Sequence, residues 1–251
     1  MAVVVGRTAG NTHSVYLVGV DGHVLASVTA ANQTTITSWP QPSPILSLWS
    51  TYATASDTRA YYLDGDNTLR YLDRAGRTGE VVQVPGDARK RSFFAVSPDD
   101  GQIAVSVLDY SAPPIVHMQF YVQDLKSGSQ SPIPTAANVY FWPVGWHSGN
   151  IVVQVGQPIP QTLYGAYPEG AADFQVIDPK TGSSLATVGG PSCAPMPSLA
   201  TPIGVVCAGA GVGTFEVVGW DGKLCPSPDP WAPKAQAFRP MGGAWPHLPA
   251  R

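Results

Sequence analysis

The chain has 251 residues, enough for one large domain or two small ones with a sizeable core. Glycine and proline are abundant, at 26 and 25 residues, whereas only 12% of the residues are charged. Glutamate and lysine, two strong helix formers, occur only three and five times. Their scarcity argues against a helical bundle and leaves few helices to cover a parallel sheet. An all-β domain is what remains. Apolar residues make up 44% of the chain, which argues against disorder.

The net charge of −3 gives no electrostatic footprint for nucleic acid or anionic lipid, so we expect no nucleic-acid partner. No stretch approaches the roughly 18 apolar residues of a membrane span, so we expect no direct membrane insertion. The first six residues are too short and too uncharged for a signal peptide. If a targeting segment has been removed, a secreted, periplasmic or extracellular location fits, and a cytoplasmic one stays open.

A repeat organises the chain. Five segments share an apolar strand, an aspartate, a turn that closes on glycine and a second strand, at intervals of about 50 residues. Their aspartates are Asp21, Asp73, Asp124, Asp178 and Asp221. An aspartate can accept hydrogen bonds from the backbone two residues on, and glycine supplies the positive φ of a tight turn. We therefore expect these five carboxylates to be structural rather than catalytic.

Between successive aspartate turns lies a second hairpin, with turns at 55–58, 97–101, 147–150 and 200–202. Each period thus holds four antiparallel strands, which is the unit of a β-propeller blade. The segment FFAVSPDDGQIAVSV at 93–107 resembles the Ser-Pro-Asp-Gly repeat of the TolB-type, WD40-like β-propellers, with one extra aspartate in its turn. The resemblance implies a propeller fold and no particular activity, because the motif recurs in proteins of many functions.

The sequence predicts a single all-β domain over residues 1–251, a β-propeller of five four-stranded antiparallel blades. Four complete blades are expected at approximately 45–86, 90–135, 138–189 and 191–227. Residues 1–31 supply only three strands. We therefore expect the tail at 231–251 to add the missing innermost strand of the first blade, which would close the ring and cover two sheet edges. The alternative is a fragment of a six- to eight-bladed propeller.

Three cysteines are present, Cys193, Cys207 and Cys225, and none forms the closely spaced pair typical of zinc or redox motifs. Cys193 and Cys207 lie at equal distances from the turn expected at residue 200. In an antiparallel hairpin they would face each other, which predicts a disulfide and, with it, an oxidising compartment. Two buried thiols are the alternative.

Propeller ligands usually meet the face built by the connections between second and third strands and between blades. Two second-to-third-strand connections are long, at 109–117 and 157–173, and loops of such length are often functional. Their aromatic and polar side chains suit sugar or peptide contacts. The connections between blades add two tryptophans, Trp39 and Trp231, and the cation Arg91. The predicted ligand-binding residues are Trp39, Arg91, His117, Tyr164, Tyr167 and Trp231.

Carbohydrate-active propellers need two or three carboxylates that converge at the channel mouth. The catalytic candidates Glu169, Asp109 and Asp173 show no paired spacing. Nucleophile-elbow, phosphate-loop, zinc-protease and dinucleotide-binding motifs are missing from the sequence, so we expect no cofactor and no metal.

These observations favour a non-catalytic binding module that presents a loop-built face to a protein or carbohydrate partner. One alternative is an extracytoplasmic glycan-acting enzyme, a glycoside hydrolase or polysaccharide lyase of the five-bladed type. The other is a sensor or scaffold domain of a larger membrane-anchored protein.

Overall fold

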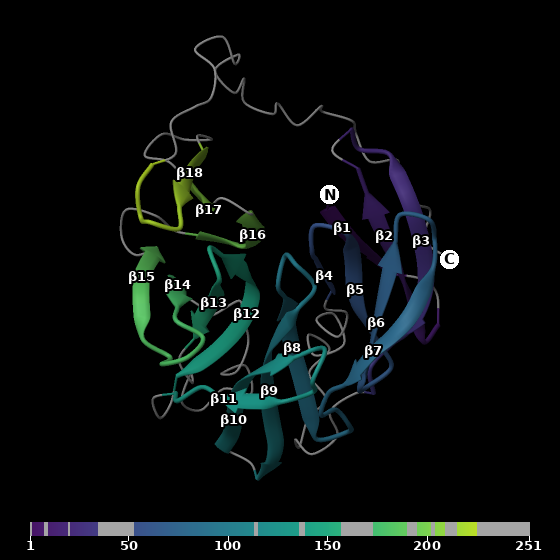
Figure 1. The fold of residues 1–251 in the computed structure, drawn as a ribbon, viewed down its shortest axis with the longest axis horizontal. Coiled ribbons are helices and arrows are strands. Elements are labelled where there is room, and N and C mark those ends of the chain that lie inside the picture. Colours follow the sequence, from purple (N-terminus) through teal and green to yellow (C-terminus); the bar gives the residue numbers. More distant parts are fainter. Residues whose placement is uncertain are drawn as a thin grey trace, which may run out of the picture.

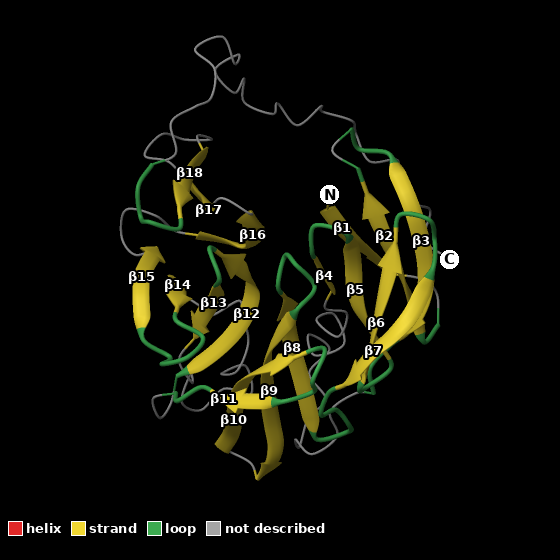
Figure 2. Cartoon of the chain, in the orientation of Figure 1, coloured by secondary structure: helices red, strands yellow, loops and turns green. Residues whose placement is uncertain are grey.

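The computed structural model describes residues 2–7, 10–19, 21–34, 53–112, 115–135, 139–156, 173–189, 195–201, 204–208 and 215–224. All regular secondary structure in these ranges is β-strand (Figure 2). Eighteen described strands form five antiparallel sheets, and in every sheet strands that follow one another in the chain lie side by side. The expectation of an all-β chain is therefore confirmed for the described residues.

The sheets follow one another along the chain. The first contains β1 (Ala2–Arg7), β2 (Thr12–Val18) and β3 (Val24–Ala31). The second contains β4 (Ala53–Ala55), β5 (Arg59–Asp64), β6 (Thr68–Asp73) and β7 (Thr78–Gln83). The third contains β8 (Lys90–Val96), β9 (Gln102–Ala112), β10 (Ile115–Asp124) and β11 (Gln130–Pro132). The fourth contains β12 (Tyr140–His147), β13 (Asn150–Gly156), β14 (Asp173–Ile177) and β15 (Ser184–Gly189). The fifth contains β16 (Pro195–Thr201), β17 (Gly204–Ala208) and β18 (Phe215–Gly219).

The five sheets are arranged around a common centre, with the first strand of each sheet innermost (Figure 1). β1 lies beside β4, β4 beside β8, and β8 beside β12. Antiparallel meanders that radiate from a centre are blades, so the fold is a β-propeller. The first and fifth sheets have three strands each in the described part of the chain. The tail at 231–251 lies outside the described residues, so ring closure stays a prediction.

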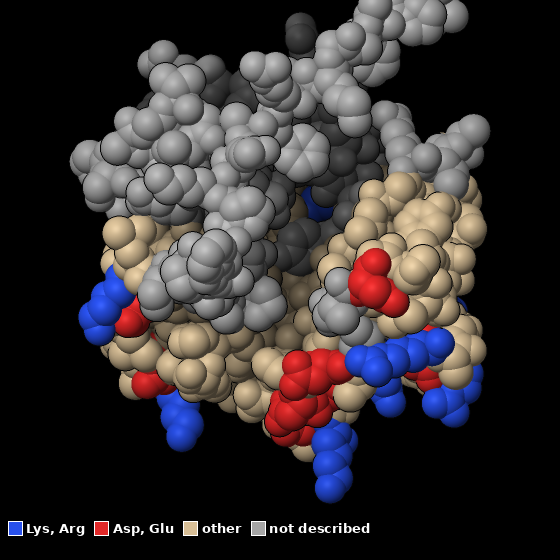
Figure 3. Space-filling model, turned by 90° about the horizontal axis from the view of Figure 1, so that it is seen from above, with Lys and Arg blue, Asp and Glu red and all other residues tan. Residues whose placement is uncertain are grey.

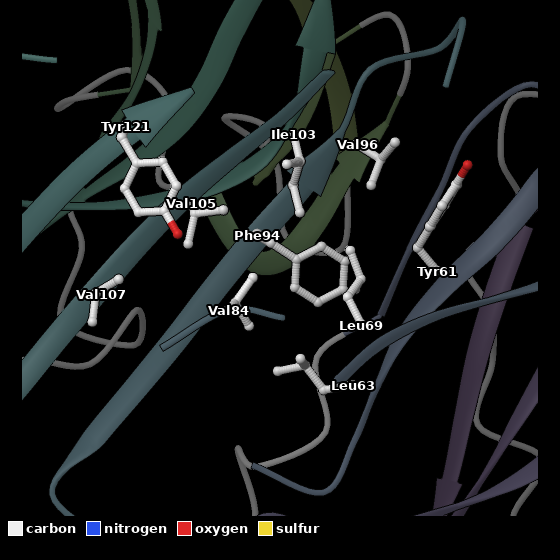
Figure 4. Packing of buried hydrophobic residues seen from close by; sticks show 10 residues of the cluster. All are labelled: Tyr61, Leu63, Leu69, Val84, Phe94, Val96, Ile103, Val105, Val107 and Tyr121. Carbon is white, nitrogen blue, oxygen red and sulfur yellow. The ribbon is translucent and has the colours of Figure 1, made fainter. Parts of the chain in front are cut away.

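The core lies between neighbouring blades rather than inside one sheet. In the second blade Tyr61, Leu63 and Leu69 are almost fully buried, and they pack against Phe94 and Ile103 of the third blade (Figure 4). Strands covered on both faces are buried along most of their length, which explains the continuous apolar runs in β5, β8 and β9. Burial of each methylene contributes about 0.8 kcal/mol, so these interfaces dominate stability.

The extra aspartate of the Ser-Pro-Asp-Gly-like turn joins the second and third blades. Asp100 has a positive φ of 62°, unusual for a residue with a side chain. Its carboxylate accepts hydrogen bonds from the Tyr61 hydroxyl at 2.8 Å and from Thr58 Oγ1 at 2.5 Å. Beside it, the Asp57 N–H donates to the Pro98 carbonyl at 3.2 Å. The turn between β8 and β9 therefore fastens the third blade to the second.

Polar contacts also join other neighbouring blades. Between the first and second blades, the Ala31 N–H donates to Asp64 Oδ1 at 2.9 Å, and the Gly65 N–H donates to the Ala31 carbonyl at 3.0 Å. Between the third and fourth blades, Trp146 Nε1 donates to the buried Ala95 carbonyl at 3.0 Å. Each of these contacts links a blade to the next blade along the chain.

The structural role expected for the five turn aspartates is confirmed. In each of the five turns the carboxylate accepts a hydrogen bond from the backbone N–H two residues on. Hydrogen bonds from the backbone and side chain of Ser127 hold the pKa of Asp124 below its ordinary value. Gly128, four residues after Asp124, has the positive φ that closes the turn.

The hairpin of the fifth sheet turns later than the sequence predicts. Its closing pair is Thr201 and Gly204, and an irregularity on β16 places Pro195 opposite Cys207. The expected direct opposition of Cys193 and Cys207 is therefore wrong by two residues, because the hairpin closes later in the chain than residue 200. Cys207 is buried and disulfide-bonded. Its partner lies outside the described residues, so pairing with Cys193 stays a prediction.

Candidate functional site

The long loop expected at 109–117 is replaced by two paired strands. β9 runs to Ala112 and β10 begins at Ile115, so Asp109 and His117 lie on strands, opposite each other. Tyr110 beside them is buried, at 4% exposure, against the fourth blade. Burial of this ring favours continued pairing, which the sequence-based interpretation of residues 109–117 as a loop did not anticipate.

Three polar side chains line up across the end of the third blade. Lys90 on β8 is the Cα partner of Asp109, and Asp109 is the Cα partner of His117. Directly opposed residues of antiparallel strands point to the same face, with Cβ atoms about 4.5–5.5 Å apart. Lys90 Nζ lies 3.6 Å from Asp109 Oδ2, and His117 is exposed. We call these residues the Lys90–Asp109–His117 row.

Asp109 is held as an ionised acceptor. Ser111 donates to Asp109 Oδ1 from its backbone N–H at 2.9 Å and from its hydroxyl at 2.5 Å. The Ser111 hydroxyl and backbone, together with Lys90, hold the pKa of Asp109 below its ordinary value, although partial burial opposes them. At neutral pH this side chain can accept hydrogen bonds or attract a cation, but it has no proton to donate.

Arg91 was expected in a connection between blades and lies instead in β8, where it is buried. Its NH1 group donates to the Asp87 carbonyl at 3.1 Å and lies 3.5 Å from Asp66 Oδ1. β8 begins at Lys90, which pairs with Asp109, so Arg91 belongs to the strand rather than to the connection before it. The guanidinium is therefore held between the second and third blades by Asp66 and Asp87.

The same end of the second blade holds two carboxylates that the sequence analysis did not select. Asp66 accepts from the backbone N–H and the hydroxyl of Thr34, both at 2.6 Å. Asp64 lies 3.0 Å from Arg70 Nε. Burial lowers the pKa of the nearby His13, which favours its neutral form. The signal that could have drawn attention to this region is the Asp-Gly-Asp-Asn turn at 64–67.

The structure does not place Asp173 beside the row. It is the first residue of β14 in the fourth blade, and it pairs with Val155 and Gly189. The remaining predicted site residues lie outside the described residues: Trp39, Tyr164, Tyr167, Glu169 and Trp231. Within the described ranges, no three His, Cys, Asp or Glu side chains group in a way that could hold a metal ion.

The charged side chains of the described surface gather along one margin in Figure 3, next to a wide area of uncharged residues.

The part of the chain that the structure describes contains no helix with the length and apolar character needed to cross a membrane.

No protein-family model matches the chain, and no curated protein matches its sequence. Several solved structures are similar to it in part. TolB from Acinetobacter baumannii has 10% identity and a TM-score of 0.38, over 89% of this chain and 61% of TolB. Prolyl oligopeptidase B from Galerina marginata has 10% identity and a TM-score of 0.45, over 88% of this chain and 32% of the oligopeptidase. Acylaminoacyl peptidase from Pyrococcus horikoshii has 11% identity and a TM-score of 0.44, over 89% of this chain and 39% of the peptidase. The chain therefore spans less than two thirds of each of these proteins, and the propeller assignment rests on its own sheet order.

Proposed function

We propose that this chain is a non-catalytic propeller module that binds a protein or carbohydrate partner through the face carrying the Lys90–Asp109–His117 row. The observation that carries the proposal is the register of β8, β9 and β10, which sets a cation, a carboxylate and an imidazole side by side. Groups fixed on strands lose little freedom when they bind, so they can recognise a polar partner without rearranging.

The contacts of the nearby carboxylates favour binding over glycoside hydrolysis. Hydrolysis needs one carboxyl group that keeps a proton and a second that stays ionised, at a defined separation. Asp109 is stabilised in its ionised form by Ser111, and Asp66 accepts two hydrogen bonds from Thr34. Both behave as fixed acceptors, which suits recognition of hydroxyl or N–H groups.

An extracytoplasmic location belongs to the same proposal. It is supported by the disulfide of Cys207, because disulfides persist in oxidising compartments. The proposed binding face serves a secreted protein and a membrane-anchored one equally.

The test is a thermal-shift screen of the whole chain against a panel of oligosaccharides and decapeptides. A specific ligand at 100 times its Kd raises the free energy of unfolding by about 2.7 kcal/mol. We expect the variant Lys90→Gln/Asp109→Asn/His117→Gln to lose the ligand-induced shift. The control Lys180→Gln/His23→Gln, changed in exposed turns at the other end of the strands, should keep it.

Two results would refute the proposal. One is a hit whose thermal shift is unchanged in the row variant, because the ligand would then bind elsewhere. The other is the release of cleaved product from an oligosaccharide hit, measured by chromatography, because the module would then be an enzyme.

A further inference from the structure

A groove of about 260 Å³ lies between the second and third blades, at the opposite end of the strands from the row. One wall comes from β5, β6 and β7, and the other comes from two turns of the third blade. Its lining includes Arg59, Tyr71, Val81, Asp100, Leu125 and Lys126. The groove has room for about one amino-acid residue and combines charged with apolar walls.

Arg59 is held in place by an aromatic ring. Its Cζ atom lies 4.4 Å from the centroid of the Tyr71 ring. Gly79 is opposite Tyr71 on β7, and a Cβ atom at Gly79 would lie 2.6 Å from Tyr71 Cε1, so the missing side chain makes room for the ring. Stacking on an aromatic face orients the guanidinium, which also interacts with the Tyr61 hydroxyl. A guanidinium carries five N–H donors, so others can still reach a ligand in the groove.

The two cations of the groove lack ion-pair partners among the described residues. The ion pairs in the described part of the chain join other side chains, and neither Arg59 nor Lys126 belongs to one. Lys126 is exposed at the rim. A stacked arginine beside an exposed lysine is suited to a planar carboxylate, which the arginine can bind through two parallel hydrogen bonds.

The carboxylates of the groove are already engaged. Asp100 accepts from the hydroxyls of Tyr61 and Thr58, and Glu80 Oε1 accepts from Gln83 Nε2 at 2.8 Å. These negative charges balance the two cations. The groove therefore suits a ligand with a single carboxylate and disfavours a polyanion, whose further charges would lie near Glu80 and Asp100.

We propose that this groove binds the C-terminal carboxylate of a peptide whose last residue is apolar. Arg59 and Lys126 face the carboxylate, and Val81 and Leu125 contact the apolar side chain. In a peptide, a carboxylate bonded directly to the Cα that carries an apolar side chain occurs only at the C-terminal residue. Aspartate and glutamate place their carboxylate at the tip of the side chain, and uronic acids have no alkyl group beside theirs.

The test is fluorescence anisotropy with the whole chain and the labelled hexapeptide Gly-Ser-Gly-Ser-Gly-Leu. With a free carboxyl end we expect a Kd of about 1 mM or tighter. The same peptide with an amidated end should bind the wild-type protein about tenfold or more weakly. The peptide with the free carboxyl end should bind the Arg59→Gln protein with a similar loss. Arg59→Lys keeps the charge without the two-pronged geometry and should give an intermediate loss.

Arg89→Gln is the matched control, because it removes an exposed arginine at the other end of the strands and should leave the Kd unchanged. Equal binding of the amidated peptide, or of the free peptide to Arg59→Gln, would overturn the proposal. Competition by an amidated peptide with an internal glutamate would also overturn it, in favour of an acidic side chain. If Arg59→Gln fails to fold, Lys126→Gln gives the same readout at an exposed position, with about threefold loss expected.

Discussion

The contact between the second and third blades can be measured through Asp100. Asp100→Ala removes the acceptor of the Tyr61 hydroxyl, which belongs to a side chain only 1% exposed. Loss of a hydrogen bond between a largely buried hydroxyl and a carboxylate costs about 1–3 kcal/mol, and the exposed Thr58 hydroxyl adds little. Alanine at a φ of 62° adds roughly 1 kcal/mol of backbone strain. We expect the free energy of unfolding to fall by about 2–4 kcal/mol.

Two further variants separate these contributions. Asp100→Gly loses the same hydrogen bonds but tolerates the positive φ, so it should be about 1 kcal/mol more stable than Asp100→Ala. In a double-mutant cycle with Tyr61→Phe, the double variant should be less destabilised than the sum of the single variants, by about 1–2 kcal/mol. Urea denaturation with a global fit of midpoint and slope measures each value.

A control cycle pairs Asp100→Ala with Tyr140→Phe. Tyr140 donates to Val116 in another blade interface, so the two effects should add within about 0.5 kcal/mol. If the Asp100 and Tyr61 variants are equally additive, the hydrogen bond does not join the blades and the reasoning is wrong.

Two other expectations concern the turns. Because hydrogen bonds from Ser127 lower the folded-state pKa of Asp124, the stability from this carboxylate is present above about pH 4 and is lost as the pH falls through the folded-state pKa. Asp124→Asn should therefore lose stability at neutral pH and show a shallower acid dependence of the urea midpoint; parallel pH profiles would contradict this. Gly182→Ala should cost more than Gly76→Ala, which should cost about 1 kcal/mol in the same assay. Both have a positive φ, but a Cβ at Gly182 would lie 2.9 Å from Ile133 Cγ2, whereas Gly76 faces open space, so equal losses would contradict the packing argument.

The local part of the fold could be predicted from the sequence because its causes are local. An aspartate followed by a glycine specifies its turn by hydrogen bonds within a few residues, and Asp73 and Asp178 form them as expected. The predictions that were wrong depended on tertiary context. The segment at 109–117 became paired strands because Tyr110 is buried against the next blade. The hairpin expected to turn at residue 200 closes instead on Thr201 and Gly204.

The candidate sites needed information that a sequence without coordinates does not contain. The Lys90–Asp109–His117 row depends on the register of three strands, and a shift of one residue would send Asp109 to the other face. The groove depends on two blades meeting, so nothing near Arg59 in sequence indicates Leu125 or Lys126 as its neighbours. Only Gly79, opposite an aromatic residue within the same blade, lay within reach of pattern analysis.

The order of the contacts between blades bears on how the chain folds. Every described sheet is a meander of consecutive strands, and bonds such as Trp146 to Ala95 and Ala31 to Asp64 join neighbouring blades. Loop closure over such moderate separations costs less entropy than pairing distant segments, so these contacts form faster than remote strand pairs do. A nascent chain can therefore dock each hairpin onto the blade just completed, with synthesis and assembly running in the same direction.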